Sequence, residues 1–488
     1  MARGAPAASG VVAMSLVLLL LMALAGAGVV RLAWGAQAGI AARCIEAGGG
    51  FLLGFVLLGA LLEWFGDALL AELRWPGLFA LLAVGVAGWG MARRFAASAE
   101  AYAAMPTSAA RTRPGLAEAL LLAALALLGA ALALQAMALP TLPWDGWNAW
   151  LAKSRAWSEA GRLLPMVPLA EWLQQPPGSA ATVAGAVYPE AVPRAVAWLL
   201  AWEGGWNEGV AHRPWWALWC ALGLLCFGGL RSEGLSTQVA ALASLLLLGL
   251  PLVTAHVAMA GYADLWLASM ILLAVICLLR FERRRDFGSL ALLLLCLALL
   301  PRIKVEGAIY ALLLAVAWGL WRLPPRWRWA TVAVAALLPL ALWQGLVLHL
   351  PVPGLGWAVL GWGEVQIPVI GTLALHWRPV GPAVLNALFV LPSFSVLWYL
   401  ALSVPLLRWR RLQRTRLASS MGFLVAAGAF HFVLFFFTDA AAWAENLTSL
   451  NRLLLHGVPA WVLMLSLLLA EPLPPREQRY GRFATLPR

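Results

Sequence analysis

The two lysines of this chain each lie a short distance from a carboxylate. Among the 34 basic residues, only Lys153 and Lys304 are lysines. Lys153 follows Asp145 by eight residues, and Lys304 precedes Glu306 by two. An ionisable side chain at the centre of a membrane helix costs about 2.5–3.5 kcal/mol, so we expect polar islands in so apolar a chain to mark a functional site.

Asp145 follows an apolar run almost directly and is therefore expected at the membrane surface. It could be a general base that takes a proton from an acceptor hydroxyl, or a metal ligand. It could also be the N-cap of the helix that follows, because Asp is a preferred cap. Lys153 lies about two helical turns further on and could share a face with Asp145. There it would either bind a phosphate or extend to lipid headgroups.

The segment Tyr188-Pro-Glu190-Ala-Val-Pro-Arg194 places an acid and a base beside a rigid turn. Tyr188 and Glu190 are candidates for positioning a substrate. Alternatively, Glu190 pairs locally with Arg194. Asp264 opens an apolar run in Gly261-Tyr262-Ala-Asp264, as either an active-site carboxylate or a helix cap, with Tyr262 beside it.

The segment 301–307 carries two bases and one acid, Arg302, Lys304 and Glu306, between two apolar runs. It is either an anion site or a neutralised structural element, and a phosphate-bearing ligand would account for its surplus positive charge.

Arg452 and His456 lie at the outer start of the last apolar run. Arg452 is either part of the anion site or an interfacial anchor paired with Glu445 or Asp439.

The composition is that of a polytopic membrane protein. The 488 residues are 63% hydrophobic and 11% charged, whereas a soluble protein has about 25% charged residues. The fold class we expect is all-α, with about thirteen membrane-spanning helices. Their expected ranges are 11–33, 48–70, 77–92, 116–139, 213–230, 236–258, 263–280, 287–302, 305–322, 329–349, 382–406, 418–437 and 453–470.

Arginine clusters indicate the orientation. The net charge of +12 comes from arginines grouped between apolar runs, a pattern that reports the cytoplasmic side and not a nucleic-acid partner. The N-terminus then starts outside. Few lysines beside many Arg, Ala, Gly and Trp suggest GC-rich coding, and hence a bacterial cytoplasmic membrane.

The polar islands all fall on the opposite, extracytoplasmic side, with two loops, 140–212 and 350–381. Residues 144–160 and 191–202 of the first loop are rich in Trp and are expected to be amphipathic helices at the membrane interface. Because ATP and nucleotide-sugars are cytoplasmic, chemistry on this side needs a donor carried by the membrane or another energy source.

These islands, in this order, resemble the GT-C superfamily of polytopic glycosyltransferases, especially the bacterial aminoarabinose transferase and protein O-mannosyltransferase type. The matching motifs are Trp144-Asp145 after a span, Tyr188-Pro-Glu190-Ala-Val-Pro193, Gly261-Tyr-Ala-Asp264, Lys304-Val-Glu306-Gly307 and Asn451-Arg452. The resemblance covers roughly residues 116–470 and makes 1–115 additional N-terminal helices and 471–488 a basic cytoplasmic tail.

The resemblance implies inverting transfer of a sugar from a polyprenyl-phosphate donor to a hydroxyl of a lipid, glycan or protein. Asp145 would be the general base, and Asp264, the second catalytic carboxylate, would position the acceptor or donor. Lys304, Arg452 and Lys153 would bind the lipid phosphate, and Glu190, Glu306, Tyr188, Tyr262 and His456 would position substrate. Since no acidic pair follows Asp145, we expect no metal and no other cofactor.

Two other functions fit the same composition. One is a transporter or flippase of a lipid-linked sugar, disfavoured because the sequence shows no paired broken helices in two halves. The other is an enzyme resembling the O-antigen ligases and polymerases, which shares the donor but uses a different set of residues.

Overall fold

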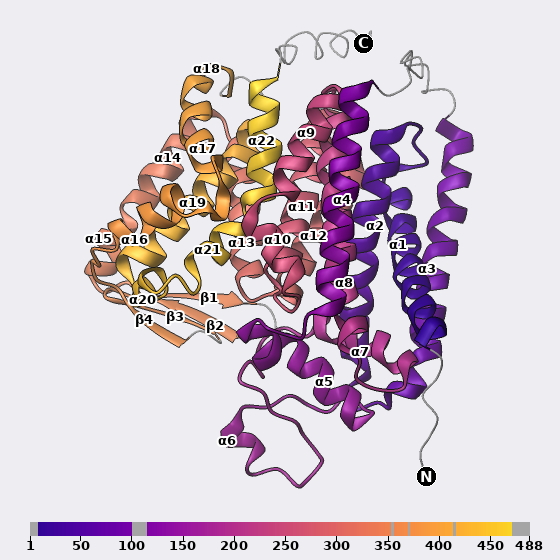
Figure 1. Ribbon diagram of the computed structural model, residues 1–488. Coiled ribbons are helices and arrows are strands. Elements are labelled where there is room, and N and C mark those ends of the chain that lie inside the picture. Colours follow the sequence, from indigo (N-terminus) through magenta and orange to yellow (C-terminus); the bar gives the residue numbers. More distant parts are fainter. Residues whose placement is uncertain (1–7, 100–114, 353–355, 369–370, 413–415, 471–488) are drawn as a thin grey trace.

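The protein is a bundle of helices with one small sheet (Figure 1), seen in a computed structural model that describes residues 8–99, 115–352, 356–368, 371–412 and 416–470. Helices account for 74% of the structure. Within these ranges, six helices are long and apolar enough to span a membrane, or seven if one bent pair counts as a span. The protein is therefore membrane-embedded, whereas the expected count of thirteen spans is not confirmed.

The spanning helices come from both halves of the chain. Four precede the first large loop: α1 (Ala8–Trp34), α2 (Ile40–Leu62), α3 (Leu70–Ala99) and α4 (Leu116–Ala138). The other two are α11 (Asp264–Arg284) and α19 (Ala418–Phe437). The bent pair is α9 (Thr237–Leu248) and α10 (Pro251–Ala258), which meet at 61°. The expected span 236–258 is therefore bent between these two helices.

The remaining apolar runs form other helices, several of them short. These are α8 (Glu208–Ser232), α12 (Phe287–Ile303), α13 (Glu306–Arg322), α14 (Pro325–Ala336), α15 (Leu338–Trp343), α16 (Gly381–Leu385), α17 (Leu397–Leu407), α18 (Trp409–Leu412), α20 (Ala441–Glu445), α21 (Leu450–Leu455) and α22 (Val458–Leu469). The expected spans 329–349 and 382–406 are each interrupted, the first by strand β1 and the second by a break before α17.

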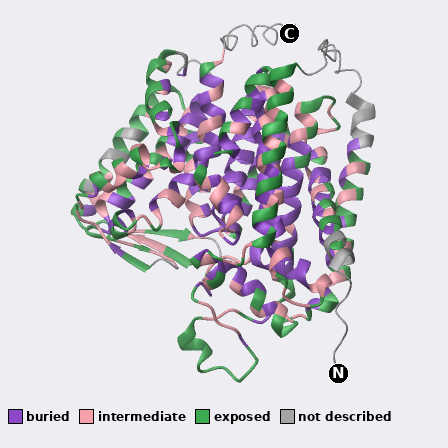
Figure 2. Cartoon of the chain, viewed as in Figure 1, coloured by how far each residue is buried: buried purple, intermediate pink, exposed green. Residues whose placement is uncertain are grey.

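Helix α11 lies at the centre of the core. Of its 21 residues, 18 are buried, as expected for a helix that is apolar on every side. It packs against α8, α12, α21 and α22. Buried residues accordingly fill the middle of the bundle, while α4 at its edge is largely exposed (Figure 2). The first residue of α11 is Asp264, so this packing fixes the site described below.

The N-terminal helices belong to the same core. Buried side chains from Leu18 to Leu468 form one hydrophobic cluster. Helices α1 and α2 approach closely because Gly54 has no side chain: a Cβ there would lie 1.9 Å from the Met22 carbonyl oxygen.

The first large loop contains four helical elements, and one of them is enclosed by the bundle. It contains the π-helical turn η3 (Gly146–Trp150), α5 (Leu151–Ala160), α6 (Leu169–Trp172) and α7 (Ala191–Glu203). Every residue from Ala191 to Leu200 is buried, because α7 packs between α2, α3, α5 and α8. The expectation that 191–202 lies on the membrane surface is therefore wrong, although the helix itself is where the sequence predicted it.

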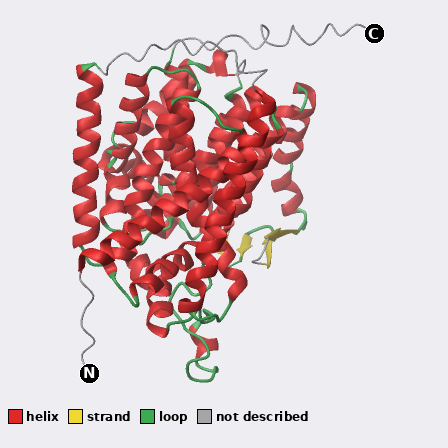
Figure 3. Cartoon of the chain, turned by 90° about the vertical axis from the view of Figure 1, so that its right-hand side faces the viewer, coloured by secondary structure: helices red, strands yellow, loops and turns green. Residues whose placement is uncertain are grey.

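The second outer loop is a sheet, so the fold is not purely α-helical. Strands β1 (Leu348–Val352), β2 (Gly356–Leu360), β3 (Glu364–Ile367) and β4 (Gly371–Ala374) form an antiparallel meander in the order β1-β2-β3-β4. The sheet lies at the same end of the bundle as α5–α7, while the arginine-containing α18 lies at the other end (Figures 1 and 3). This separation agrees with the predicted division into two faces.

Candidate functional site

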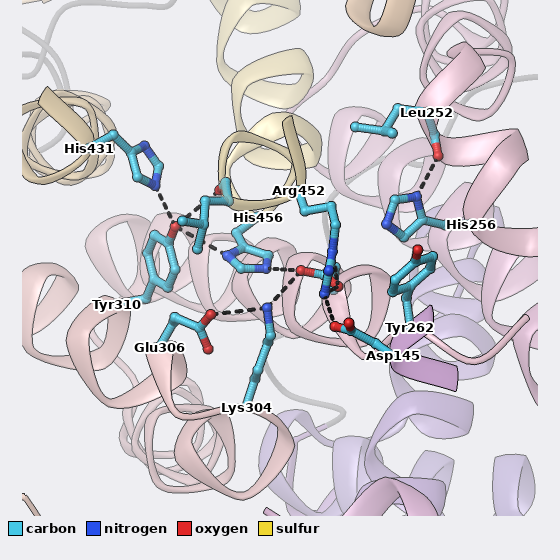
Figure 4. Close-up of polar contacts among 12 residues, drawn as sticks. Asp145, Leu252, His256, Tyr262, Lys304, Glu306, Tyr310, His431, Arg452 and His456 are labelled. Atoms are coloured by element: carbon cyan, nitrogen blue, oxygen red, sulfur yellow. Dashed lines mark hydrogen bonds and ion pairs between the residues drawn. The ribbon is translucent and has the colours of Figure 1, made fainter. Parts of the chain in front are cut away.

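Helix ends from distant parts of the chain meet at Asp264. Its carboxylate is fully buried and accepts from Lys304 Nζ at 2.8 Å and from Arg452 Nη2 at 3.0 Å and Nε at 3.2 Å. Arg452 binds the Oδ2 atom of Asp264. Lys304 binds Oδ1, and His456 Nε2 lies 2.9 Å from the same atom. Lys304 directly follows the last residue of α12. Arg452 lies in α21, and His456 directly follows the last residue of α21. Asp264 is thus the hub of a buried charge cluster. Figure 4 labels its partners Lys304, Arg452 and His456.

Asp145 is the more accessible carboxylate of this cluster. Its Oδ2 accepts from Arg452 Nη2, so one guanidinium joins Asp145 to Asp264. Its side chain is 26% exposed, compared with 0% for Asp264. Within the described ranges, Asp145 Oδ1 has no hydrogen-bond partner. The cap interpretation is not supported, because the Asp145 side chain makes no capping bond to the turn that follows.

Lys304 is shared between two carboxylates. Its Nζ lies 3.0 Å from Glu306 Oε1, besides the contact with Asp264. Arg302 points elsewhere and pairs with Glu63 of η1 (Glu63–Phe65). The surplus positive charge inferred for 301–307 is therefore absent: the cluster holds three carboxylates and two permanent cations among the residues that the structure describes.

The guanidinium of Arg452 also stacks on an aromatic ring. Its Cζ lies 4.4 Å from the centre of the Tyr262 ring, and His256 of α10 lies 4.9 Å from the same ring. Arg452 Nη1 has no hydrogen-bond partner among the described residues, and the side chain is 16% exposed. It is therefore the cation best placed to meet an anionic ligand. The suggested partners Glu445 and Asp439 do not pair with it; Asp439 instead binds Arg378.

Two residues that the sequence analysis missed extend the cluster into the bundle. Tyr310 Oη lies 3.2 Å from His456 Nδ1 and 2.8 Å from His431 Nε2. An ionised Asp264 requires the proton on His456 Nε2, which leaves Nδ1 as an acceptor for the Tyr310 hydroxyl. His431 lies within the apolar run 418–437, and an ionisable residue inside a span is a signal that could have identified it. Tyr310 carries no such signal.

Lys153, Tyr188 and Glu190 form a second, adjoining cluster. Lys153 Nζ is buried and donates to the carbonyl oxygens of Ala186 and Tyr188 at 2.7 and 2.6 Å. Glu190 lies 3.6 Å from Lys153 and pairs mainly with Arg194, as its local interpretation predicted. Lys153 thus ties α5 to the segment before α7, and this buried position does not support its expected role in phosphate binding.

Lys153 makes its bonds to Ala186 and Tyr188, and no contact with Asp145 is seen among the described residues; the turn between Asp145 and Lys153 is π-helical. A π-turn holds more than 3.6 residues, so the spacing of two α-helical turns does not apply between them. Burial lowers the pKa of Lys153 to about 8, opposed by the charge of Glu190. Burial likewise raises the pKa of the Tyr188 hydroxyl; Glu306 adds to this effect and Lys304 opposes it. Tyr188 therefore lies within electrostatic range of the first cluster.

No known protein family, curated protein or solved structure matches this chain. The site is therefore interpreted from its geometry. It offers a partly exposed carboxylate with one free oxygen, held by an arginine that is anchored on a buried acid. Such a carboxylate can accept a proton, and the free guanidinium nitrogen can stabilise a nearby anion.

Proposed function

We propose that the chain is a membrane glycosyltransferase acting on the extracytoplasmic face of a bacterial cytoplasmic membrane. It would move a sugar from a polyprenyl-phosphate donor to a hydroxyl of a lipid, glycan or protein. The observation that carries the proposal is the pairing of the accessible Asp145 with the anchored Arg452. One partner supplies a base and the other a cation within the reach of a single substrate.

Asp145 Oδ1 would take the proton of the acceptor hydroxyl. The acceptor oxygen then forms its bond to the anomeric carbon while the bond from that carbon to the phosphate oxygen breaks, and polyprenyl phosphate leaves with the electron pair. A single displacement inverts the anomeric configuration. Arg452 Nη1 is placed to stabilise the developing phosphate charge, with Lys304 behind it.

Asp264 is assigned the role of positioning Arg452 in this proposal, and not the direct positioning of the acceptor or donor that the resemblance implied. A side chain with no exposed surface cannot touch a substrate, and its oxygens already accept from Lys304 and Arg452. It would hold Arg452 in place. Metal independence stays a prediction, tested by measuring transfer with and without a chelator.

Turnover by the purified protein tests the proposal. The protein is reconstituted in nanodiscs with a radiolabelled polyprenyl-phosphate sugar and a cell-envelope extract as acceptor. We expect donor-dependent transfer by the native chain and a loss of at least about 100-fold in D145N, the usual size of a general-base contribution. E159Q is the matched control: Glu159 of α5 pairs with the exposed Arg155, and its change should leave transfer unchanged. Full activity of D145N would refute the assignment.

Transport of a lipid-linked sugar is the second candidate, favoured by the bent pair α9–α10. Broken helices beside a binding site are typical of transporters, and His256 of α10 packs against Tyr262 next to Arg452. The two functions differ in product. Transport would move intact donor across a proteoliposome membrane without release of polyprenyl phosphate, whereas transfer releases it.

A further inference from the structure

The sheet β1–β4 is held at the level where a spanning helix ends. After β4, the backbone N–H of His376 donates to Phe437 O and that of Arg378 to Phe436 O, both at 2.7 Å. Phe437 is the last residue of α19. The Trp377 ring packs on Phe436 and Phe437, with ring centres 5.5 and 5.3 Å apart. Aromatic groups at the end of a span mark the boundary between acyl chains and headgroups.

The two faces of the sheet differ in polarity. Cross-strand pairing places one row of residues on one face: Leu348, Leu360, Val365 and Leu373. The next row lies on the opposite face: His349, Val359, Gln366 and Thr372. Because side chains alternate along a strand, Leu350 and Ala358 join the first row. One face is therefore wholly apolar. The other is mixed: Gln366 and Thr372 of β3 and β4 are polar, whereas in β1 and β2 His349 lies beside the apolar Pro351, Trp357 and Val359.

The protein covers only part of the apolar face. Leu373 of β4 is buried, and Val365 and Ile367 of β3 pack against the core. In β1, however, Leu350 is 45% exposed. The segment that leads into β1 is also exposed, at Trp343, Leu346 and Val347. From 343 to 360 the sequence contains no Asp, Glu, Lys or Arg.

The spanning helix α19, to whose end the segment after β4 is bonded, has exposed apolar side chains of its own. Val425, Phe432 and Val433 of that span are exposed, as expected for side chains facing acyl chains. Figure 3 shows the sheet at the end of the bundle and to one side of it, beyond the helices. A charge-free apolar face at this level would cost free energy in water, at about 25 cal/mol for each Å².

We propose that the β1–β2 half of the sheet lies in the membrane interface. Its apolar face would rest on the lipid acyl chains of the outer leaflet, with the opposite face toward water. The occupant is the bilayer surface, because the sheet is tied to the end of a spanning helix and its uncovered face carries no charge. This proposal does not depend on the proposed function.

Depth measurements with spin labels on neighbouring residues test the proposal. Single cysteines at Leu350 and His349 lie on opposite faces of one strand. They are introduced into the full chain with Cys44 and Cys220 changed to Ala, labelled with a nitroxide and placed in phospholipid nanodiscs. We expect the ratio of collisions with O₂ to collisions with a water-soluble nickel chelate to be several-fold higher for L350C than for H349C.

Each other outcome would overturn the proposal. Equal access to the nickel chelate at both positions would place the sheet in water. A label at 350 that is shielded from both reagents, with spin–spin coupling between copies, would show a protein–protein contact instead. If L350C does not fold, as judged by thermal unfolding, L360C and V359C provide the same comparison on β2.

Discussion

At the level of single residues, Asp264 and Asp145 differ in what their loss leaves behind. In D264N, Lys304 and Arg452 lose the charge that compensates them in a buried position, and breaking a buried pair in this way costs about 3–5 kcal/mol. In D145N, Arg452 keeps Asp264, so we expect a loss of about 1 kcal/mol or less. Thermal unfolding in detergent measures both variants. Equal destabilisation would show that Asp264 is not the hub.

The hydroxyl of Tyr310 gives a second prediction at this scale. In Y310F the acceptor His456 Nδ1 loses its donor inside the bundle, so we expect a loss of about 1–3 kcal/mol. The ring and its packing are retained, so the effect is confined to hydrogen bonding. F423L, a substitution at a ring 6.4 Å away, is the control for packing. A stability of Y310F equal to that of the native chain would mean that the hydroxyl contributes nothing to the cluster.

The sequence predicted the core of the candidate site better than its surroundings. Asp264, Lys304 and Arg452 could be identified because isolated charges in apolar runs need partners, and the structure brings them together. Their pairing could not be predicted, since it depends on how α11, α12 and α21 pack. For the same reason the phosphate role of Lys153 and the catalytic role of Asp264 were assigned without knowledge of their burial.

At the level of elements, Lys153 makes the connection between α5 and α7 depend on pH. Burial lowers the pKa of Lys153 to about 8 in the folded state, whereas the pKa of a lysine in the unfolded chain is about 10.4. Between these values the unfolded state binds more protons, so stability rises with pH. We expect the stability of the native chain relative to K153M to increase by up to about 3 kcal/mol over this interval. Unfolding temperatures of the native chain and of K153M at pH 7.5, 9 and 10 measure this increase. The same temperature difference between the two proteins at every pH would contradict the prediction.

The contact between α1 and α2 gives the second prediction for elements. In G54A the new methyl group would collide with the Met22 carbonyl, and overpacking of this kind costs about 1–3 kcal/mol. G90A is the control, because a Cβ at Gly90 meets nothing within 4 Å. We expect the unfolding temperature of G54A to be lower than those of G90A and of the native chain. The reverse order would mean that the two helices separate at no cost.

The long apolar helices could be predicted from the sequence, but the sheet and the buried α7 could not. Runs of about 20 apolar residues specify a span almost alone, which explains α1, α4 and α19. The sequence predicts 350–381 as a loop, and which of its residues pair as strands depends on contacts that composition does not show. The tryptophans of α7 suggested the membrane interface, but neighbouring helices enclose them.

At the level of the whole molecule, the two ends of the bundle should face different compartments. Gln175 lies in the first large loop, and Phe287 lies at the opposite end, where α12 begins. In a chain with Cys44 and Cys220 replaced by Ala, we expect an impermeant maleimide to label Q175C in intact cells. F287C should react only after permeabilisation. Labelling of F287C in intact cells would reverse the orientation and place the site in the cytoplasm.

We propose that the cluster around Arg452 receives a lipid-linked phosphate, and native mass spectrometry of the purified protein would detect that ligand. With added polyprenyl phosphate, we predict a one-to-one adduct for the native chain and for R302Q, whose arginine pairs outside the cluster. The adduct should be much weaker for R452Q. An adduct equally stable in R452Q, or no adduct with the native chain at any concentration, would show that Arg452 does not bind the lipid-linked phosphate.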